Sequence, residues 1–184
     1  MDLTISAREN MSKGELNRIR REGDIPAVVY DRSGNAKSVT IKGTEFHAHL
    51  RAIEKGCLAT QFFNVTDGKE KYKVLIKEIT YDRTKYTVLH IDLMKVEDKD
   101  NVTIHVPVLC KGEDVCAGIT EGGQLKRVKR SVKVSLKVAD IPKAFVLDVS
   151  KVRLGEALRV RDLDLKEGMN VRLQKTQVLV AVSK

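Results

Sequence analysis

Hydrophobic and polar residues alternate in several short segments of this 184-residue chain. A period of two is typical of β-strands that bury one face. The alternation occurs at residues 73–77, 102–106 and 132–138, and residues 177–182 (QVLVAV) predict a more fully buried closing strand. Residues 26–30 (PAVVY) predict a further strand that ends in a tyrosine. Most of the chain therefore reads as strands and turns, which indicates a mostly-β protein with a few helices.

A first short helix is predicted after residue 12. Ser12 and Glu15 have the spacing of a capping box, in which each residue hydrogen-bonds the backbone N–H of the other. Leu16 and Ile19 then form a narrow apolar stripe, and Gly23 is a stop signal. This helix leads directly into the strand at residues 26–30.

A second helix is predicted in the middle of the first half. Thr44 is expected to cap it, and Phe46, Leu50 and Ile53 give it an apolar face. Gly56 lies just past its expected end.

Five consecutive polar residues, 97–101, separate two strand-like runs and predict a short linker. The predicted domains are residues 1–96 and residues 97–184, and each is long enough for a small core. Their net charges are +4 and +5, so bulk charge does not say which domain meets a charged partner.

The overall charge of +9 favours a polyanionic partner. The chain has no tryptophan and only 4% aromatic residues, which disfavours a broad stacking platform for single-stranded nucleic acid. It has no apolar run long enough to span a membrane and no secretory pattern at its start, so we expect no membrane partner. Its three cysteines form no CxxC pair and fit a reducing compartment, so a cytoplasmic protein is expected.

The first helix carries a polar stripe. Lys13, Asn17 and Arg20 lie at positions i, i+4 and i+7, with Arg21 beside them, a spacing that can follow a row of phosphates. The alternative is a solvated helix face, because residues 1–32 hold six basic and six acidic residues.

Three further residues favour RNA recognition. Tyr30 ends its strand and can present its ring to a base or ribose, although the residue taken alone is better explained as a tyrosine at the rim of a barrel. His90 and Asp92 lie two residues apart and so share one strand face. An imidazole donates to phosphate, and a carboxylate accepts from exocyclic amines. The preceding turn-like segment, residues 80–86, adds Arg83 and Lys85.

The sequence offers little support for a metal site or a nucleotide-binding site. His105, Cys110 and Cys116 give only three candidate zinc ligands without paired spacing, and no phosphate-binding loop is present. We therefore expect no metal and no cofactor. A basic run without an intervening acid follows residue 125, and it is either a solvated strand face or a second surface for RNA or protein: Lys126, Arg127, Lys129, Arg130, Lys133 and Lys137.

Taken in order, these motifs resemble a known family. The segments RREG at residues 20–23, IPAVVY at 25–30 and HID at 90–92 are similar to the bacterial large-subunit ribosomal proteins that bind 5S rRNA. The resemblance is to the long, two-domain form called general stress protein Ctc. It continues through the second half in the family's order, at residues 106–108, 111–113, 121–123, 141–142, 147–150 and 155–163.

The resemblance implies an N-terminal β-barrel that binds the loop E region of 5S rRNA, followed by a mainly-β C-terminal domain. The family's RNA contacts fall on the helix cations, the tyrosine and the HxD pair, with one looser match near the start: Lys13, Arg20, Arg21, Tyr30, His90, Asp92 and the looser Arg8. Thr80 stands where the family often has an amide side chain, and Leu93 replaces the usual aromatic residue.

The leading hypothesis is a non-catalytic, rRNA-binding component of the large ribosomal subunit on the cytoplasmic ribosome. One alternative is a stress-related adaptor that acts through protein contacts of its C-terminal domain. Another is an enzyme using His90 and Asp92, which lacks any motif for a nucleophile. The partner of the C-terminal domain stays open between neighbouring ribosomal proteins and rRNA.

Overall fold

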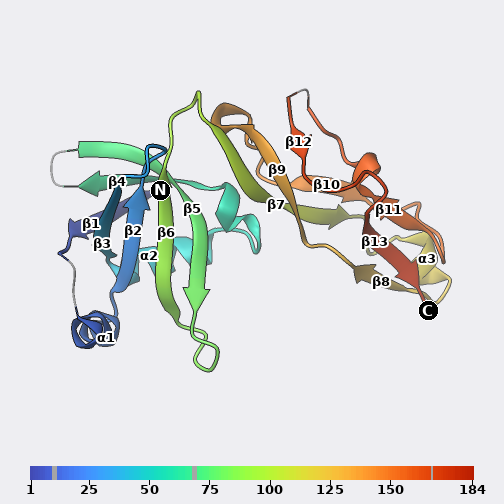
Figure 1. Ribbon diagram of the computed structural model, residues 1–184. Helices are drawn as coiled ribbons and strands as arrows, with labels where there is room; N and C mark the ends of the chain where they lie inside the picture. Colours follow the sequence, from blue (N-terminus) through green and yellow to red (C-terminus); the bar gives the residue numbers. More distant parts are fainter. Residues whose placement is uncertain (10–11, 68–69, 167) are drawn as a thin grey trace. The chain divides into compact units, whose positions relative to one another are not determined.

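The computed structural model describes residues 1–9, 12–67, 70–166 and 168–184. Its contacts divide the chain into two compact units, Met1–Asp100 and Asn101–Lys184, called unit 1 and unit 2 below. The predicted linker lies at this division. Both units consist mainly of strands (Figure 1), which confirms the predicted mostly-β class.

Unit 1 is a closed six-stranded barrel with the strand order β1-β3-β2-β6-β5-β4. Parallel pairing of β1 with β4 closes it, and β2 also runs parallel to β6. Its elements are β1 (Asp2–Ala7), α1 (Lys13–Glu22), β2 (Ile25–Tyr30), β3 (Ala36–Ile41), α2 (Gly43–Ala52), the 3₁₀ helix η1 (Cys57–Thr60), β4 (Phe62–Asp67), β5 (Glu70–Tyr81) and β6 (Val88–Lys95).

One side of each barrel strand is buried. In β6, Ile91 and Leu93 are fully buried while the alternating residues reach the surface. Phe46 of α2 and Phe63 of β4 are also fully buried and pack in the same core. The outward side of β2, β6 and β5 carries the polar residues Tyr30, His90, Asp92 and Glu78 together with the half-buried Val28 and Met94.

The first helix begins and ends as predicted. Ser12 Oγ accepts the Glu15 N–H, and Glu15 Oε2 accepts the Ser12 N–H at 2.7 Å. The Ser12 N–H and the Ser12 hydroxyl both donate to Glu15 Oε2, which holds the pKa of Glu15 below its usual value. Gly23 closes the helix in the left-handed conformation, with φ of 90°.

The prediction for the second helix is wrong at both ends. The helix begins at Gly43, so Thr44 lies inside it, and it ends at Ala52, with Ile53 already extended. Gly43 lies against the end of α1, where a Cβ would collide with the Gly23 carbonyl oxygen. Its N–H donates to Asp24 Oδ1 at 3.3 Å, so a side chain distant in sequence takes the place of the expected cap.

Unit 2 contains a four-stranded sheet, β10-β7-β9-β12, and a three-stranded sheet, β11-β13-β8. Valine, isoleucine and leucine side chains of β7, β9 and β13 form its core. Its elements are β7 (Asn101–Lys111), α3 (Ala117–Thr120), β8 (Gln124–Arg127), β9 (Ser131–Lys137), η2 (Val138–Asp140), β10 (Phe145–Asp148), β11 (Ala157–Arg159), η3 (Val160–Asp162), β12 (Asn170–Val171) and β13 (Val178–Ser183).

The remaining strand predictions are confirmed with shifted ends. Residues 73–77 and 102–106 lie inside the longer β5 and β7, and the closing strand is β13. The strand predicted at 132–138 is β9, but Val138 already belongs to η2. None of the described helices is long and apolar enough to cross a membrane.

Candidate nucleic-acid interface

The candidate site lies on the outward side of the barrel, where α1 packs beside β2 and β6. Ile19 of α1 is buried and Leu16 is half-buried, so the helix docks through the predicted apolar stripe. The polar stripe therefore turns toward solvent, with Lys13 and Arg21 exposed and Arg20 half-buried.

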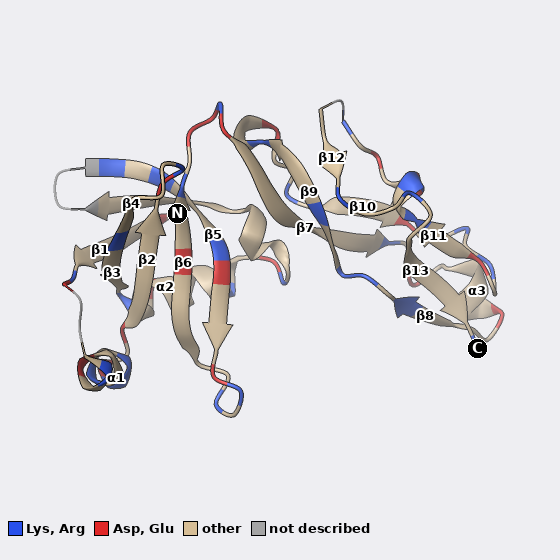
Figure 2. Ribbon diagram, in the orientation of Figure 1, with Lys and Arg blue, Asp and Glu red and all other residues tan. Residues whose placement is uncertain are grey.

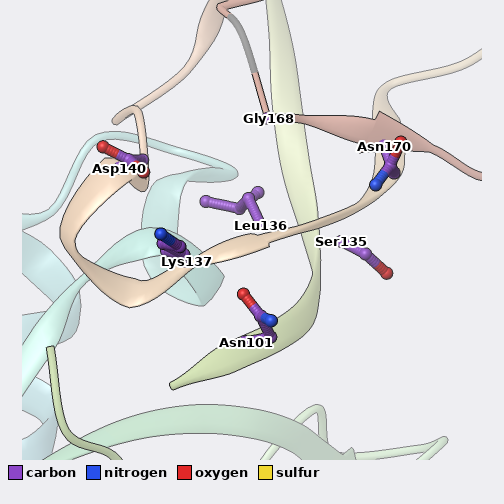
Figure 3. Close-up of a pocket in the computed structure, with 7 residues that line it drawn as sticks. All are labelled: Asn101, Ser135, Leu136, Lys137, Asp140, Gly168 and Asn170. Carbon is purple, nitrogen blue, oxygen red and sulfur yellow. The ribbon is translucent and has the colours of Figure 1, made fainter. Parts of the chain in front are cut away.

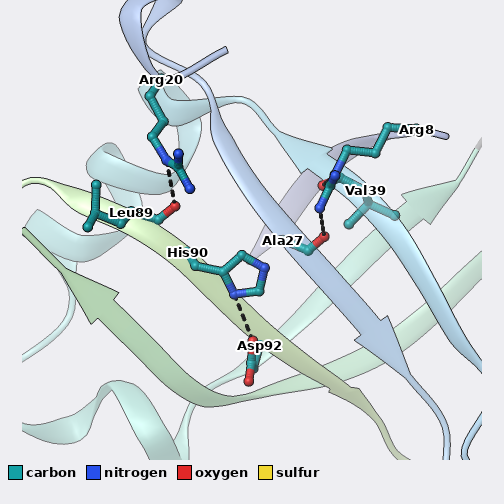
Figure 4. Close-up of polar contacts among 7 residues, drawn as sticks. All are labelled: Arg8, Arg20, Ala27, Val39, Leu89, His90 and Asp92. Atoms are coloured by element: carbon teal, nitrogen blue, oxygen red, sulfur yellow. Dashed lines mark hydrogen bonds and ion pairs between the residues drawn. The ribbon is translucent and has the colours of Figure 1, made fainter. Parts of the chain in front are cut away.

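Arg20 connects the helix to the barrel. Its Nε donates to the Leu89 carbonyl oxygen at 3.1 Å (Figure 4), and its Nη1 donates to Asn17 Oδ1 at 3.1 Å. Because Leu89 directly precedes His90 on β6, this hydrogen bond holds the Arg20 guanidinium beside the strand that carries His90. A guanidinium with a fixed orientation loses less entropy when it binds a phosphate.

Arg8 lies on the same side of the barrel. Its Nε donates to the Val39 carbonyl at 3.0 Å and its Nη2 to the Ala27 carbonyl at 3.5 Å, so it spans β3 and β2 (Figure 4). Partial burial, and then the charge of Arg20, lower the pKa of Arg8. The two guanidinium groups thus repel each other on one surface, and a bound anion would relieve that repulsion.

His90 and Asp92 point outward from β6 as a hydrogen-bonded pair. His90 Nδ1 lies 2.8 Å from Asp92 Oδ1, and the two side chains are 30% and 40% exposed. The contact holds the imidazole by Nδ1 and leaves its Nε2 edge directed away from the carboxylate (Figure 4). The pair therefore presents one hydrogen-bonding imidazole edge and one carboxylate oxygen to a ligand.

Tyr30 and Glu78 complete this surface. Tyr30 is half-buried at the end of β2, and burial, followed by the charges of Asp92 and Glu78, raises the pKa of its hydroxyl. Glu78 of β5 is the direct strand partner of Asp92, and Thr80 is the partner of His90. Arg8, Arg20, Tyr30, Glu78, His90 and Asp92 are called the barrel face below.

The sequence did not indicate Glu78. It shares a face with Asp92 only because the β5–β6 register shifts between Ile76 and Glu78. Without this bulge, Ile76 and Glu78 would point the same way, yet Ile76 is buried and Glu78 is exposed. Residue patterns along a single strand do not reveal such a shift.

The β5–β6 hairpin loop holds the two remaining predicted cations. Thr80 and Tyr81, predicted as loop, belong to β5, so the loop begins at Asp82. Asp82 Oδ1 accepts hydrogen bonds from the Thr84 hydroxyl and from the backbone N–H groups of Thr84 and Lys85. These bonds lower the pKa of Asp82 to about 2.

This fixed turn exposes Arg83 and Lys85 to solvent. It also holds Tyr86, which the sequence did not single out, at a positive φ of 55° with 81% of its surface exposed. Figure 1 shows the hairpin loop and α1 at the same end of the barrel, and Figure 2 shows Lys and Arg on both.

The comparisons with known proteins agree across the whole chain. The model of the ribosomal L25p family matches residues 3–93, and that of the ribosomal protein TL5 C-terminal domain matches residues 101–184. The chain is 31% identical to the large ribosomal subunit protein bL25 of Chlamydia trachomatis serovar L2 over the full length of both proteins. The same protein of Chlamydia muridarum and of Chlamydia pneumoniae is also 31% identical over both full lengths. This chain belongs to the ribosomal L25p family.

Membership of the L25p family confirms the resemblance expected from the sequence. The proteins of this family are structural components of the ribosome, so the chain is not an enzyme, and the alternative based on His90 and Asp92 is set aside. The family also places the chain on the cytoplasmic ribosome, as predicted.

The candidate zinc ligands have a different role in this L25p protein. Cys116 is buried and its Sγ donates to the Val152 carbonyl at 3.4 Å, whereas His105 is exposed on β7. Within the described ranges, no group of three or more His, Cys, Asp and Glu side chains is placed to hold a metal ion.

Proposed function

We propose that this chain is assembled into the large ribosomal subunit and binds 5S rRNA, in its loop E region, through the barrel face. The bL25 relatives are named as large-subunit proteins, and the motif order in unit 1 resembles that of the 5S rRNA-binding family. The role is structural, because the bound RNA undergoes no reaction.

The observation that carries the proposal is the combination of two guanidinium groups with a carboxylate–imidazole pair on one open surface. Arg8 and Arg20 are fixed by backbone carbonyls and can each donate two parallel hydrogen bonds to a phosphate. His90 and Asp92 lie between β2 and β5, where a carboxylate would repel phosphate but accepts from the exocyclic amine of a base.

The cations around the barrel face are placed to contact an RNA duplex that extends beyond the His90–Asp92 pair. Lys13 and Arg21 on α1, and Arg83 and Lys85 on the hairpin loop, project at the same end of the barrel. Wide, shallow RNA minor grooves are recognised by contacts to base edges, riboses and the flanking phosphates. The ring of Tyr30 supplies a flat surface for one ribose or base beside the His90–Asp92 pair.

The test is a chemical footprint of the chain on purified 5S rRNA, combined with titrations at several salt concentrations. Protection of loop E is expected, together with a clear preference over an unrelated RNA duplex of equal length. If about 4–6 phosphates are contacted, log K falls with log salt with a slope of roughly −3 to −5.

Equal affinity for 5S rRNA and for the unrelated duplex would overturn the proposal. Retention of the chain on large subunits without any footprint on 5S rRNA would also overturn it and would favour a protein-binding adaptor. Arg18→Ala is a control for substitutions of the barrel-face arginines, since Arg18 lies on α1 but pairs with Glu22 on the helix surface.

A further inference from the structure

The solvent side of the four-stranded sheet in unit 2 has a distinctive composition. Val102 and Ile104 of β7 and Val134 of β9 are buried, so the alternating residues of these strands point outward. The outward residues of β7, β9 and the β12 segment, called the basic sheet face, are Asn101, Thr103, His105, Ser131, Lys133, Ser135, Lys137, Asn170 and Arg172. None of these residues is acidic.

The strand registers bring these residues into rows. His105 pairs with Lys133, and Asn101 pairs with Lys137. Lys133 and Lys137 are four residues apart on β9, which separates them by about 13 Å along the strand. The lysines therefore form a line of exposed charge, with hydroxyl and amide groups between them.

Arg172 is held in place at the centre of this face. Its Nε donates to Ser135 Oγ at 3.3 Å, and that hydroxyl is hydrogen-bonded to Thr103 Oγ1 at 2.7 Å. Its backbone N–H donates to the Lys133 carbonyl at 3.0 Å. Among the described residues, its two Nη groups have no protein partner, so they are available for bidentate contact with a phosphate.

The structure separates the basic run of residues 126–137 into different environments. Arg127 is bonded to Glu113, and Lys126 donates to the Lys184 carbonyl. Only Lys133 and Lys137 of the run lie on the basic sheet face, where Arg172 from a distant part of the sequence joins them. Sequence order alone therefore does not define this surface.

A hollow of about 360 Å³ adjoins the face, and four of its lining residues belong to the face: Asn101, Ser135, Lys137 and Asn170. Figure 3 shows them with Leu136, Gly168 and Asp140, which is the last residue of η2 and adds one carboxylate to the lining. The volume is at the small end of the range for ligand pockets and suits a sugar–phosphate unit of a nucleic-acid chain.

We infer that the basic sheet face is a second RNA-binding surface, which takes the sugar–phosphate backbone of structured RNA without reading its sequence. Phosphate and ribose contacts are made by Lys, Arg and hydroxyl or amide side chains, which are the groups that this face provides. The anchors of protein interfaces are enriched in tryptophan, tyrosine and arginine, and lysine is depleted there; the basic sheet face has two lysines and no tryptophan or tyrosine. None of the large exposed hydrophobic residues described in unit 2 belongs to the basic sheet face: Val146 lies on β10, at the opposite edge of the same sheet from β12, and Val115, Ile119, Val128 and Leu165 lie on other segments.

The experiment compares two variants of the full chain with six substitutions each, and both carry Lys13→Ala, Arg20→Ala and Arg21→Ala so that unit 1 contributes less. The face variant is Lys133→Ala, Lys137→Ala and Arg172→Ala, and the control variant removes the same charge at Lys126, Lys129 and Lys151. The probe is a fluorescein-labelled 20-base-pair RNA duplex, measured by anisotropy at several salt concentrations.

The face variant is expected to bind the duplex at least tenfold more weakly and to lose about 2–3 from the salt slope, while the control loses less than 1. Equal losses in the two variants would overturn the inference. So would a face variant that keeps its duplex affinity but is no longer retained on large subunits, since the surface would then bind protein. Matching circular dichroism melts of both variants exclude unfolding. The outcome does not depend on whether unit 1 binds 5S rRNA.

Discussion

The barrel face and the basic sheet face both hold cations against the outward side of strands, but they differ in acidic residues. On the barrel face, Arg8 and Arg20 lie beside the carboxylates of Asp92 and Glu78. The basic sheet face has none on its strands. Because carboxylates repel phosphates, they are useful to an RNA-binding surface only where base edges come close. In our proposal, unit 1 therefore recognises specific RNA features and unit 2 adds affinity.

The two faces also hold their central arginine differently. Arg20 donates to a backbone carbonyl, which no side-chain substitution at Leu89 removes. Arg172 instead relies on the hydroxyl of Ser135, which is itself bonded to Thr103. Deletion of the Ser135 hydroxyl therefore removes the partner of Arg172 Nε, whereas deletion of the Asn17 side chain still leaves Arg20 bonded to the Leu89 carbonyl.

The largest expected effect comes from the core beneath the barrel face. Ile91 is fully buried between His90 and Asp92 on β6, so Ile91→Ala leaves a cavity directly under the pair. We expect the free energy of unfolding of unit 1 to fall by about 2–5 kcal/mol, as measured by urea denaturation followed by circular dichroism. Binding of an RNA duplex by unit 2 should persist after unit 1 has unfolded. If duplex binding by unit 2 were lost together with the fold of unit 1, the two faces would not belong to independent units.

A smaller effect separates base recognition from charge. Asp92→Ala should weaken 5S rRNA binding by about 1–3 kcal/mol with little change in salt slope, because it removes a base contact and no cation. Lys126→Ala removes a charge from unit 2 and should lower the affinity for 5S rRNA less than Asp92→Ala does. Both affinities are measured by filter binding. A larger loss of 5S rRNA affinity for Lys126→Ala would place the specific RNA contacts in unit 2 instead of unit 1.

The features that could be predicted from the sequence are local ones. The capping box of Ser12 and Glu15, the stop at Gly23 and the shared face of His90 and Asp92 depend on spacings of two to four residues within one element. Each of these motifs alone is also compatible with an ordinary solvated surface, and only their joint order along the chain is typical of an RNA-binding family.

The features that the sequence did not predict depend on contacts between distant segments. The start of α2 is set by the Gly23 carbonyl and by Asp24, and Glu78 reaches the barrel face through a bulge. Arg172 reaches the basic sheet face through the pairing of β12 with β9. Register and close packing of this kind are properties of the folded chain, and no local pattern encodes them.

The smallest expected effect concerns how the two units present their cations, since Lys133 and Lys137 of unit 2 project from a strand while Arg83 and Lys85 of unit 1 project from a loop shaped by Asp82. The pKa of Asp82 is lowered to about 2 because its ionised carboxylate accepts three hydrogen bonds. Its contribution to the turn is therefore present above the pKa of the unfolded chain, near 4, and is lost as the pH falls through about 2.

An NMR titration should show the Thr84 and Lys85 amide signals moving together with a midpoint near pH 2. Asp82→Asn should abolish that titration and weaken 5S rRNA binding less than threefold, while leaving duplex binding by the basic sheet face unchanged. A midpoint near pH 4 would mean that the carboxylate does not shape the loop, and the cations of the hairpin would then be held no more firmly than ordinary surface lysines.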